Sequence, residues 1–135
     1  MYHTRLMPPV DINATVMANA RLSRDYSVLS LAAPEVGRRT APGQFVMVKP
    51  AGVTDPLLRR PFSVFEVLRD AAGEVTGVSI LNKRAGRSTN KLYELEPGDV
   101  VGVHASPKPV TLLHPKGYRY FSMLRQKLRW HERAS

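Results

Sequence analysis

The sequence predicts an all-β fold: a six-stranded antiparallel Greek-key β-barrel with one short helix. Two observations support this class. Six short segments rich in β-branched and aromatic residues follow one another at hairpin spacing, separated by turn signals rich in Gly, Pro and Asp. The length of 135 residues and a hydrophobic content of 43% also suit one packed domain.

The predicted strands follow from local composition. The first covers residues 12–22, where small and apolar side chains alternate imperfectly, and the second covers residues 26–32. Residues 1–11 form a loose lead-in, and residues 34–43 are predicted to be a polar loop. The remaining strands are predicted at residues 44–49, 61–69, 75–83 and 100–103. A hairpin signal at residues 70–74 joins the fourth strand to the fifth.

One short helix is expected between the fifth and sixth strands. Ser88 or Thr89 is the predicted N-cap, and the helix should run to about Leu95. Residues 96–99 read Glu-Pro-Gly-Asp, which ends the helix and turns the chain into the last strand.

Several function classes are excluded or disfavoured. The chain contains no cysteine, which excludes disulfides and thiolate-held zinc or iron–sulfur centres within it. No metal site is expected, because the four histidines lack the spacing of metal ligands; these are His3, His104, His114 and His131. No Ser/His/Asp set suggests nucleophilic catalysis, so no catalytic residue is expected. No apolar run approaches the roughly 20 residues of a membrane span, and the N-terminus lacks the apolar segment of a signal peptide. The sequence therefore predicts a cytoplasmic protein.

The formal net charge of +9 raises a nucleic-acid-binding alternative. Residues 1–107 have a net charge of only +3, however, whereas residues 108–135 carry +6. The basic tail also contains Tyr118, Tyr120, Phe121 and Trp130, which could bind RNA. A solvated tail explains the same composition, so a non-enzymatic nucleic-acid-binding barrel remains the disfavoured alternative.

The strongest functional signal is the stretch Arg60-Pro61-Phe62-Ser63. Pro61 fixes its own φ and favours an extended conformation at Arg60, so the guanidinium is held at the start of a strand, where it could bind phosphate through two parallel hydrogen bonds. Phe62 offers a flat apolar ring and Ser63 a hydroxyl. This combination suits a nucleotide with a planar ring, but an edge strand with solvated arginines fits the residues equally well.

A second candidate site lies at residues 81–89. Lys83, Arg84 and Arg87 bring positive charge, and Gly86 lets the backbone approach a ligand closely. Ser88 and Thr89 stand at a helix start, where N–H groups favour an anion. An ordinary capped helix is the alternative for this segment alone. Together with Arg60, the segment would form a phosphate site supplied from two sides.

These motifs resemble a known family. Arg60-Pro61-Phe62-Ser63 is similar to the flavin signature of the ferredoxin-reductase-like FAD-binding barrels. Two further segments lie before and after this stretch, in the order in which the family's motifs occur: residues 42–45 (Pro-Gly-Gln-Phe) and 86–89 (Gly-Arg-Ser-Thr). The Arg-Pro-x-Ser form most resembles the electron-transfer subunits of dihydroorotate dehydrogenase, enzymes of pyrimidine biosynthesis, over residues 12–103.

The resemblance implies an FAD-binding oxidoreductase module and assigns roles to residues. Arg60, with Pro61 beside it, would contact the FAD phosphates, Phe62 would pack on the isoalloxazine and Ser63 would lie near flavin N5. Leu81, Asn82 and Lys83 would line the cofactor edge. Ser88 and Thr89, after Gly86, would bind the pyrophosphate. The implied partner is a catalytic dihydroorotate dehydrogenase subunit, and NAD would bind only if a further domain were present.

The resemblance ends after Val103. We expect an FAD-binding barrel domain at residues 1–104 and an atypical basic extension at residues 105–135, with the NAD-binding domain and iron–sulfur cysteines of such proteins absent. This change in composition indicates a shifted reading frame or a shortened gene product, which would not be competent for the reaction alone. A short helix is expected at residues 120–130, where Phe121, Leu124 and Leu128 share a face.

Overall fold

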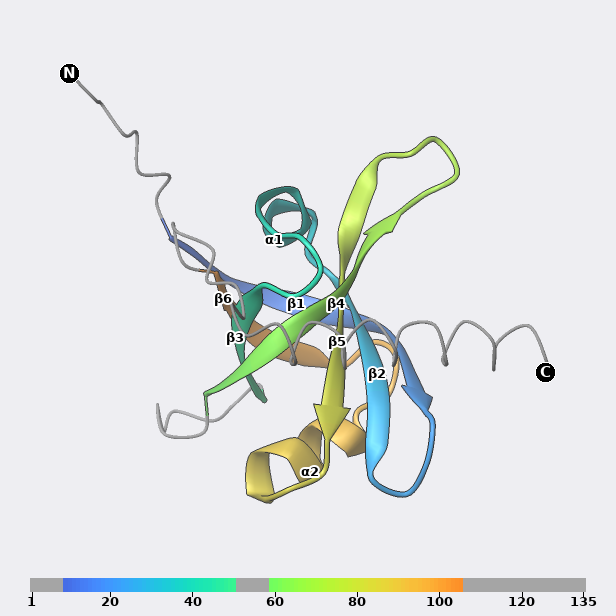
Figure 1. The fold of residues 1–135 in the computed structure, drawn as a ribbon, viewed down its shortest axis with the longest axis vertical. Helices are drawn as coiled ribbons and strands as arrows, with labels where there is room; N and C mark the ends of the chain where they lie inside the picture. Colours follow the sequence, from blue (N-terminus) through green and yellow to red (C-terminus); the bar gives the residue numbers. More distant parts are fainter. Residues whose placement is uncertain (1–8, 51–58, 106–135) are drawn as a thin grey trace.

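The computed structural model describes residues 9–50 and 59–105, and these form a closed barrel of six antiparallel strands (Figure 1). The strands are β1 (Val10–Arg21), β2 (Tyr26–Ala32), β3 (Phe45–Pro50), β4 (Arg60–Arg69), β5 (Val75–Lys83) and β6 (Val100–Ala105). Their order around the barrel is β1-β2-β5-β4-β3-β6. Because β6 lies beside β3 while β3, β4 and β5 are consecutive neighbours, the connections form a Greek key, which confirms the predicted fold class.

Alternating side chains fill the barrel. In β2, Leu29 and Leu31 are fully buried, and their neighbours in the strand are only half-buried. The register places Leu29 opposite Ile80 of β5, and Val48 of β3 opposite Val103 of β6. Side chains that lie directly opposite each other in antiparallel strands share a face, so these pairs point into one common core.

The segment at residues 34–43, predicted to be a polar loop, contains a helix. Helix α1 (Pro34–Arg39) begins with Pro at its first turn and buries Val36 and Gly37. The approach to β5 is close: a Cβ at Gly37 would lie 2.5 Å from Val75 Cγ1 and 2.8 Å from the carbonyl oxygen of Gly77. The helix therefore depends on Gly37, whose missing side chain lets the helix backbone pack against β5.

The second helix covers one open end of the barrel (Figure 1). Helix α2 (Arg87–Glu94) inserts Leu92, which is fully buried, into the core. Its N-cap is Gly86, not Ser88 or Thr89 as predicted. Thr89 instead occupies the third helical position, where its hydroxyl accepts hydrogen bonds from the N–H groups of Ala85 (2.8 Å) and Gly86 (2.9 Å). The prediction placed the cap inside the helix because it relied on residue type alone.

Strand boundaries differ slightly from those predicted. The first strand begins at Val10 and the last ends at Ala105, so each includes two residues that the sequence pattern did not assign to it. The register explains this extension, since Val10 pairs with Ala105 between β1 and β6. The helix expected at residues 120–130 and the basic extension lie outside the described residues.

Candidate functional site

A basic cleft separates the start of β4 from the N-terminal end of α2. It has a volume of about 300 Å³ and is lined by Arg60, Pro61, Phe62, Ala85, Gly86, Arg87, Ser88 and Thr89. Six of the ten residues that the sequence indicated are thus brought together from two segments more than twenty residues apart. A cleft of this size is at the low end for small-molecule sites, so it suits one part of a large ligand.

Strand register determines how Arg60 enters the cleft. Arg60 pairs with Val48 and Phe62 with Val46, and both valines point into the core. Arg60 and Phe62 therefore face the barrel interior, but Arg60 is the first residue of its strand and remains exposed at the barrel end. Phe62 is only 6% exposed and belongs to the core, so its role as a ring platform stays a prediction.

Arg59 has a different environment. Its guanidinium lies 3.6 Å from the Asp11 carboxylate of β1, and its side chain is 25% exposed. The extended backbone directs consecutive side chains to opposite faces, as the sequence predicted for this pair. Arg59 does not line the cleft, which makes it a natural control for Arg60.

The first turn of α2 supplies backbone donors. The first helical hydrogen bond runs from the N–H of Asn90 to the carbonyl of Gly86 at 2.9 Å, so the N–H groups of residues 87–89 precede the helical pattern and are directed toward the cleft end of the helix. The Thr89 hydroxyl accepts two hydrogen bonds and donates a third, at 3.1 Å, to the Gly86 carbonyl. That hydroxyl is therefore fully used, and Thr89 can serve an anion only through its backbone.

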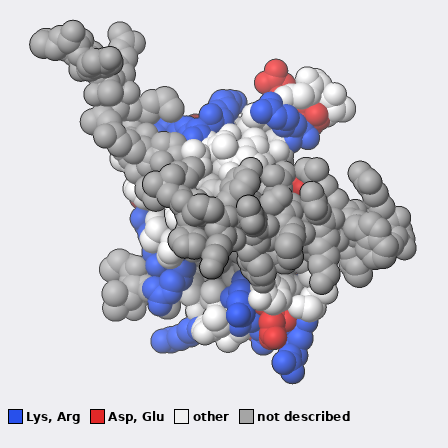
Figure 2. Space-filling model, in the orientation of Figure 1, with Lys and Arg blue, Asp and Glu red and all other residues white. Residues whose placement is uncertain are grey.

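The positive charges predicted around the cleft divide into two groups. Arg87 lines the cleft beside Arg60. Arg84, in contrast, has a structural role, because its guanidinium donates to Asn90 and to the Arg24 carbonyl, both at 3.1 Å, and lies 4.6 Å from the Tyr93 ring centroid. Figure 2 shows how Lys and Arg side chains are spread over one face of the described surface, with fewer acidic ones among them.

Four predicted site residues lie outside the cleft: Ser63, Leu81, Asn82 and Lys83. Strand pairing explains their positions. Ser63 pairs with Phe45 and Leu81 with Val28, and Ser63 and Leu81 are half-buried on the outer face of the barrel. Lys83 is exposed, with its ammonium 5.9 Å from the centre of the Tyr26 ring.

Asn82 is fully buried and faces the barrel interior opposite Ser27. Its amide nitrogen donates to the Thr89 carbonyl at 3.0 Å, and the Ser27 hydroxyl lies 3.4 Å away. Asn82 therefore connects β5 to the first turn of α2, immediately beside the cleft. It contacts the helix that forms the cleft, although it does not line the cleft itself.

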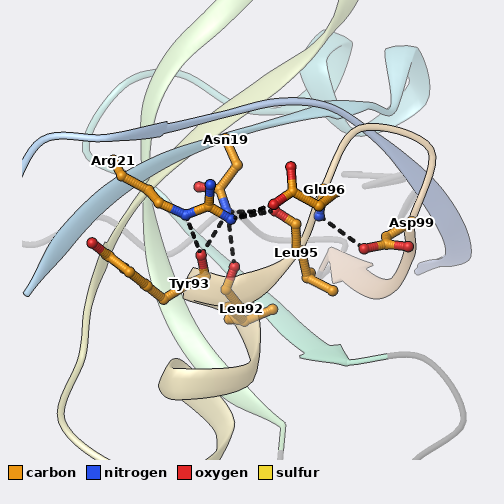
Figure 3. A network of polar contacts seen from close by, with 7 residues as sticks. All are labelled: Asn19, Arg21, Leu92, Tyr93, Leu95, Glu96 and Asp99. Carbon is orange, nitrogen blue, oxygen red and sulfur yellow. Dashed lines mark hydrogen bonds and ion pairs between the residues drawn. The ribbon is translucent and has the colours of Figure 1, made fainter.

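Sequence reasoning missed the contacts that hold the far end of α2 (Figure 3). The Asn19 side-chain amide donates to the carbonyls of Leu92, Tyr93 and Leu95 at 3.2, 3.0 and 2.9 Å. Arg21 donates to the last two of these carbonyls and pairs with Glu96 at 2.9 Å. Partners more than 70 residues apart leave no local signal, so the pattern of the sequence could not have indicated them.

A second cleft of about 380 Å³ lies beside the other end of α2 and is lined by Pro50, Lys91, Glu94, Leu95, Asp99 and Val100. It is larger, but two carboxylates oppose a single ammonium there. That charge balance disfavours an anionic ligand, so we assign the phosphate-binding role to the smaller, basic cleft.

The described ranges contain neither a candidate metal-binding cluster nor a helix that could span a membrane. Among residues 9–50 and 59–105, no group of three or more His, Cys, Asp or Glu side chains is placed to hold a metal ion. Within the same ranges, neither helix is long and apolar enough to cross a membrane.

Comparison with known proteins adds the family. No protein-family model matches the chain. The electron transfer subunit of dihydroorotate dehydrogenase B (NAD(+)) from Desulforamulus reducens is 33% identical over 91 residues, which is 67% of this chain and 33% of that subunit. A ferredoxin reductase of carbazole 1,9a-dioxygenase has a similar structure, with a TM-score of 0.59 at 21% identity, over 78% of this chain and 30% of that one. This chain therefore has the barrel fold of ferredoxin reductases, and its sequence is similar to that of dihydroorotate dehydrogenase electron-transfer subunits.

Further matches define the extent of this relationship. A ferredoxin NADP⁺ reductase from Neisseria gonorrhoeae with bound FAD and NADP superposes with a TM-score of 0.55 at 14% identity, over 78% of this chain and 40% of that one. The chain spans about a third of the dihydroorotate dehydrogenase subunit that it matches. An NAD kinase of Cupriavidus pinatubonensis is 54% identical over 41 residues, 30% of this chain but 13% of the kinase. None of these relatives supports the nucleic-acid-binding alternative.

Proposed function

We propose that this ferredoxin-reductase-like barrel binds FAD with the pyrophosphate in the basic cleft, and that it is the flavin-holding part of an electron-transfer protein. The observation that carries the proposal is the convergence of Arg60, Arg87 and the first turn of α2 on one cleft. Two guanidinium groups and the N-terminal end of a helix together make a donor set suited to a diphosphate. The similarity to electron transfer subunits supports the wider role.

Each group in the cleft has a distinct task. Arg60 would bind one phosphate through its planar fork, because the extended start of β4 presents the side chain at the barrel end. The backbone N–H groups of residues 87–89 would donate to the phosphate oxygens, and the α2 dipole favours the negative charge there. Gly86 leaves open space, since a Cβ at this position would meet no atom within 4 Å. Backbone and ligand can therefore approach closely.

The flavin supplies the redox chemistry when it is bound, and the chain supplies position and charge. We propose that the ring lies beyond the cleft, near Phe62 and Ser63, with Leu81 and Lys83 of β5 along the cofactor edge. Asn82 is buried, so we assign it to holding α2 in place instead of contacting the ring. No general base is required for hydride transfer to flavin.

The partner proposal follows from the relatives. A protein named as an electron transfer subunit works with at least one other subunit. We propose that the partner is a catalytic dihydroorotate dehydrogenase subunit, and that NAD takes part only through a domain additional to this barrel.

The test is titration of the purified chain with FAD, followed by quenching of flavin fluorescence. We expect stoichiometric uptake of FAD and a yellow protein. A parallel titration with single-stranded RNA at low and moderate salt examines the alternative. Tight, salt-sensitive RNA binding without FAD uptake would contradict the proposal.

A further inference from the structure

Helix α2 spans the open end of the barrel, and side chains of two strands hold its backbone at its two ends. Asn82 of β5 binds the carbonyl of Thr89 in the first turn. Asn19 of β1 binds three carbonyls in and just after the last turn. Between these two contacts, Leu92 is fully buried in the core. The helix has eight residues, so its ends move together as one short rod of about 12 Å.

The role of Asn19 follows from helix chemistry. The last carbonyls of a helix have no intrahelical donor, and leaving them unpaired beside an apolar core is costly. Helix α2 does not end in a glycine cap; the residue that follows it is Leu95, in an extended conformation with φ −64° and ψ 144°. The two hydrogens of the Asn19 amide are shared among three carbonyl oxygens, and the Leu92 carbonyl also accepts a long hydrogen bond of 3.4 Å from the N–H of Leu95. A strand side chain thus does what a local C-cap does elsewhere, and it also fixes where the helix lies along its axis.

Register explains why Asn19 can reach these carbonyls. Asn19 pairs with Leu29, whose side chain is in the core, so Asn19 faces the barrel interior at its α2 end. Arg21, two residues further along the same face, donates to the Tyr93 carbonyl at 3.0 Å and lies 5.6 Å from the Tyr93 ring centroid. The contacts of Arg21 are exposed, whereas those of Asn19 are partly buried. Asn19 is therefore the central residue of this end.

We propose that Asn19 is a positioning residue for phosphate binding: by holding the C-terminal carbonyls of α2, it sets the place of the N-terminal N–H groups in the basic cleft. This inference rests on the proposed function. Arg60 enters the cleft from β4, and the N–H groups of residues 87–89 enter it from the helix. Donors on two separate elements match a diphosphate only if the helix cannot slide or tilt relative to the strand.

The variant Asn19→Asp tests the role with minimal change of shape. The carboxylate has no hydrogen to donate, and its negative charge opposes the C-terminal end of the helix dipole. Asn13→Asp is the matched control, because Asn13 is an exposed residue of the same strand and pairs with Gly102 of β6. Both variants carry the same charge change on β1.

FAD affinity and amide hydrogen exchange are measured for the wild type and both variants, at a temperature where circular dichroism shows all three folded. We expect Asn19→Asp to lose FAD affinity by about tenfold or more, and Asn13→Asp by less than about twofold. Exchange should accelerate at residues 86–90 in Asn19→Asp, while the core strands keep their protection. Any uptake of riboflavin, which has the ring without phosphates, should be the same in the wild type and in Asn19→Asp.

Three outcomes separate the claims. No FAD binding by the wild type would overturn the proposed function and, with it, this inference. Wild-type binding with equal affinity in Asn19→Asp would overturn the positioning role alone. Loss of FAD and riboflavin affinity by the same factor, or faster exchange throughout the barrel, would also overturn it, because a merely structural defect has that signature.

Discussion

Replacing Arg60 by alanine should weaken FAD binding about ten- to a hundredfold and leave the barrel folded. The side chain is exposed at the start of β4, and its guanidinium donates a long hydrogen bond of 3.4 Å to the Arg59 carbonyl. Its removal therefore costs the fold little. A charge-assisted hydrogen bond to phosphate contributes on the order of 1.5–3 kcal/mol, and 1.4 kcal/mol corresponds to tenfold in affinity.

Two further variants refine the prediction. Arg60→Lys should recover part of the affinity, because an ammonium keeps the charge but not the planar fork. Arg59→Ala is the control: it removes an ion pair with Asp11 at 3.6 Å, whose contribution near the surface is about 0–1 kcal/mol, and takes nothing from the cleft. The assay is FAD titration with circular dichroism as the folding check. Equal affinity for the wild type and Arg60→Ala, or a larger loss in Arg59→Ala, would refute the assignment of Arg60.

Three more substitutions test other parts of the account. Gly86→Ala should keep or slightly raise the free energy of unfolding, since its φ of 173° is extended and a Cβ meets no atom within 4 Å, yet it should weaken FAD binding by filling the space left for the ligand. Gly77→Ala should lower the free energy of unfolding in urea by about 3 kcal/mol, because its Cβ would overlap the Leu31 carbonyl oxygen; an unchanged midpoint would count against the packing of β2 on β5. Tyr93→Phe removes a 2.7 Å hydrogen bond to the Ser23 carbonyl and should cost about 1 kcal/mol of stability, measured by the same denaturation.

Strand positions were predictable from the sequence because alternation is a local property. Val46 and Val48, for example, both point inward in a segment whose β-branched and aromatic residues already indicated a strand. Helix α1 was not predictable, since six residues give no periodic signal. Its formation depends on the close approach of Gly37 to β5, which only the folded barrel reveals.

Part of the candidate site was also predictable, because its signals are local in the sequence. The cleft residues Arg60 and Gly86 belong to short motifs that indicate phosphate binding: an arginine at the start of a strand and a glycine before a helix. The contact of Asn82 with the cofactor stays a prediction; its burial was not evident from the sequence, because it follows from the alternation along β5 that turns the side chain into the barrel. Asn19 carried no signal at all, because its partners lie 73 to 76 positions away.

The most direct test of the central claim is where FAD contacts the chain. Backbone amide resonances of isotope-labelled protein are recorded during an FAD titration. The account predicts that the largest shifts fall at residues 85–89 and at Arg60, around the basic cleft. Largest shifts instead at Lys91, Glu94 and Val100, around the second cleft, or no saturable shifts at all, would contradict it.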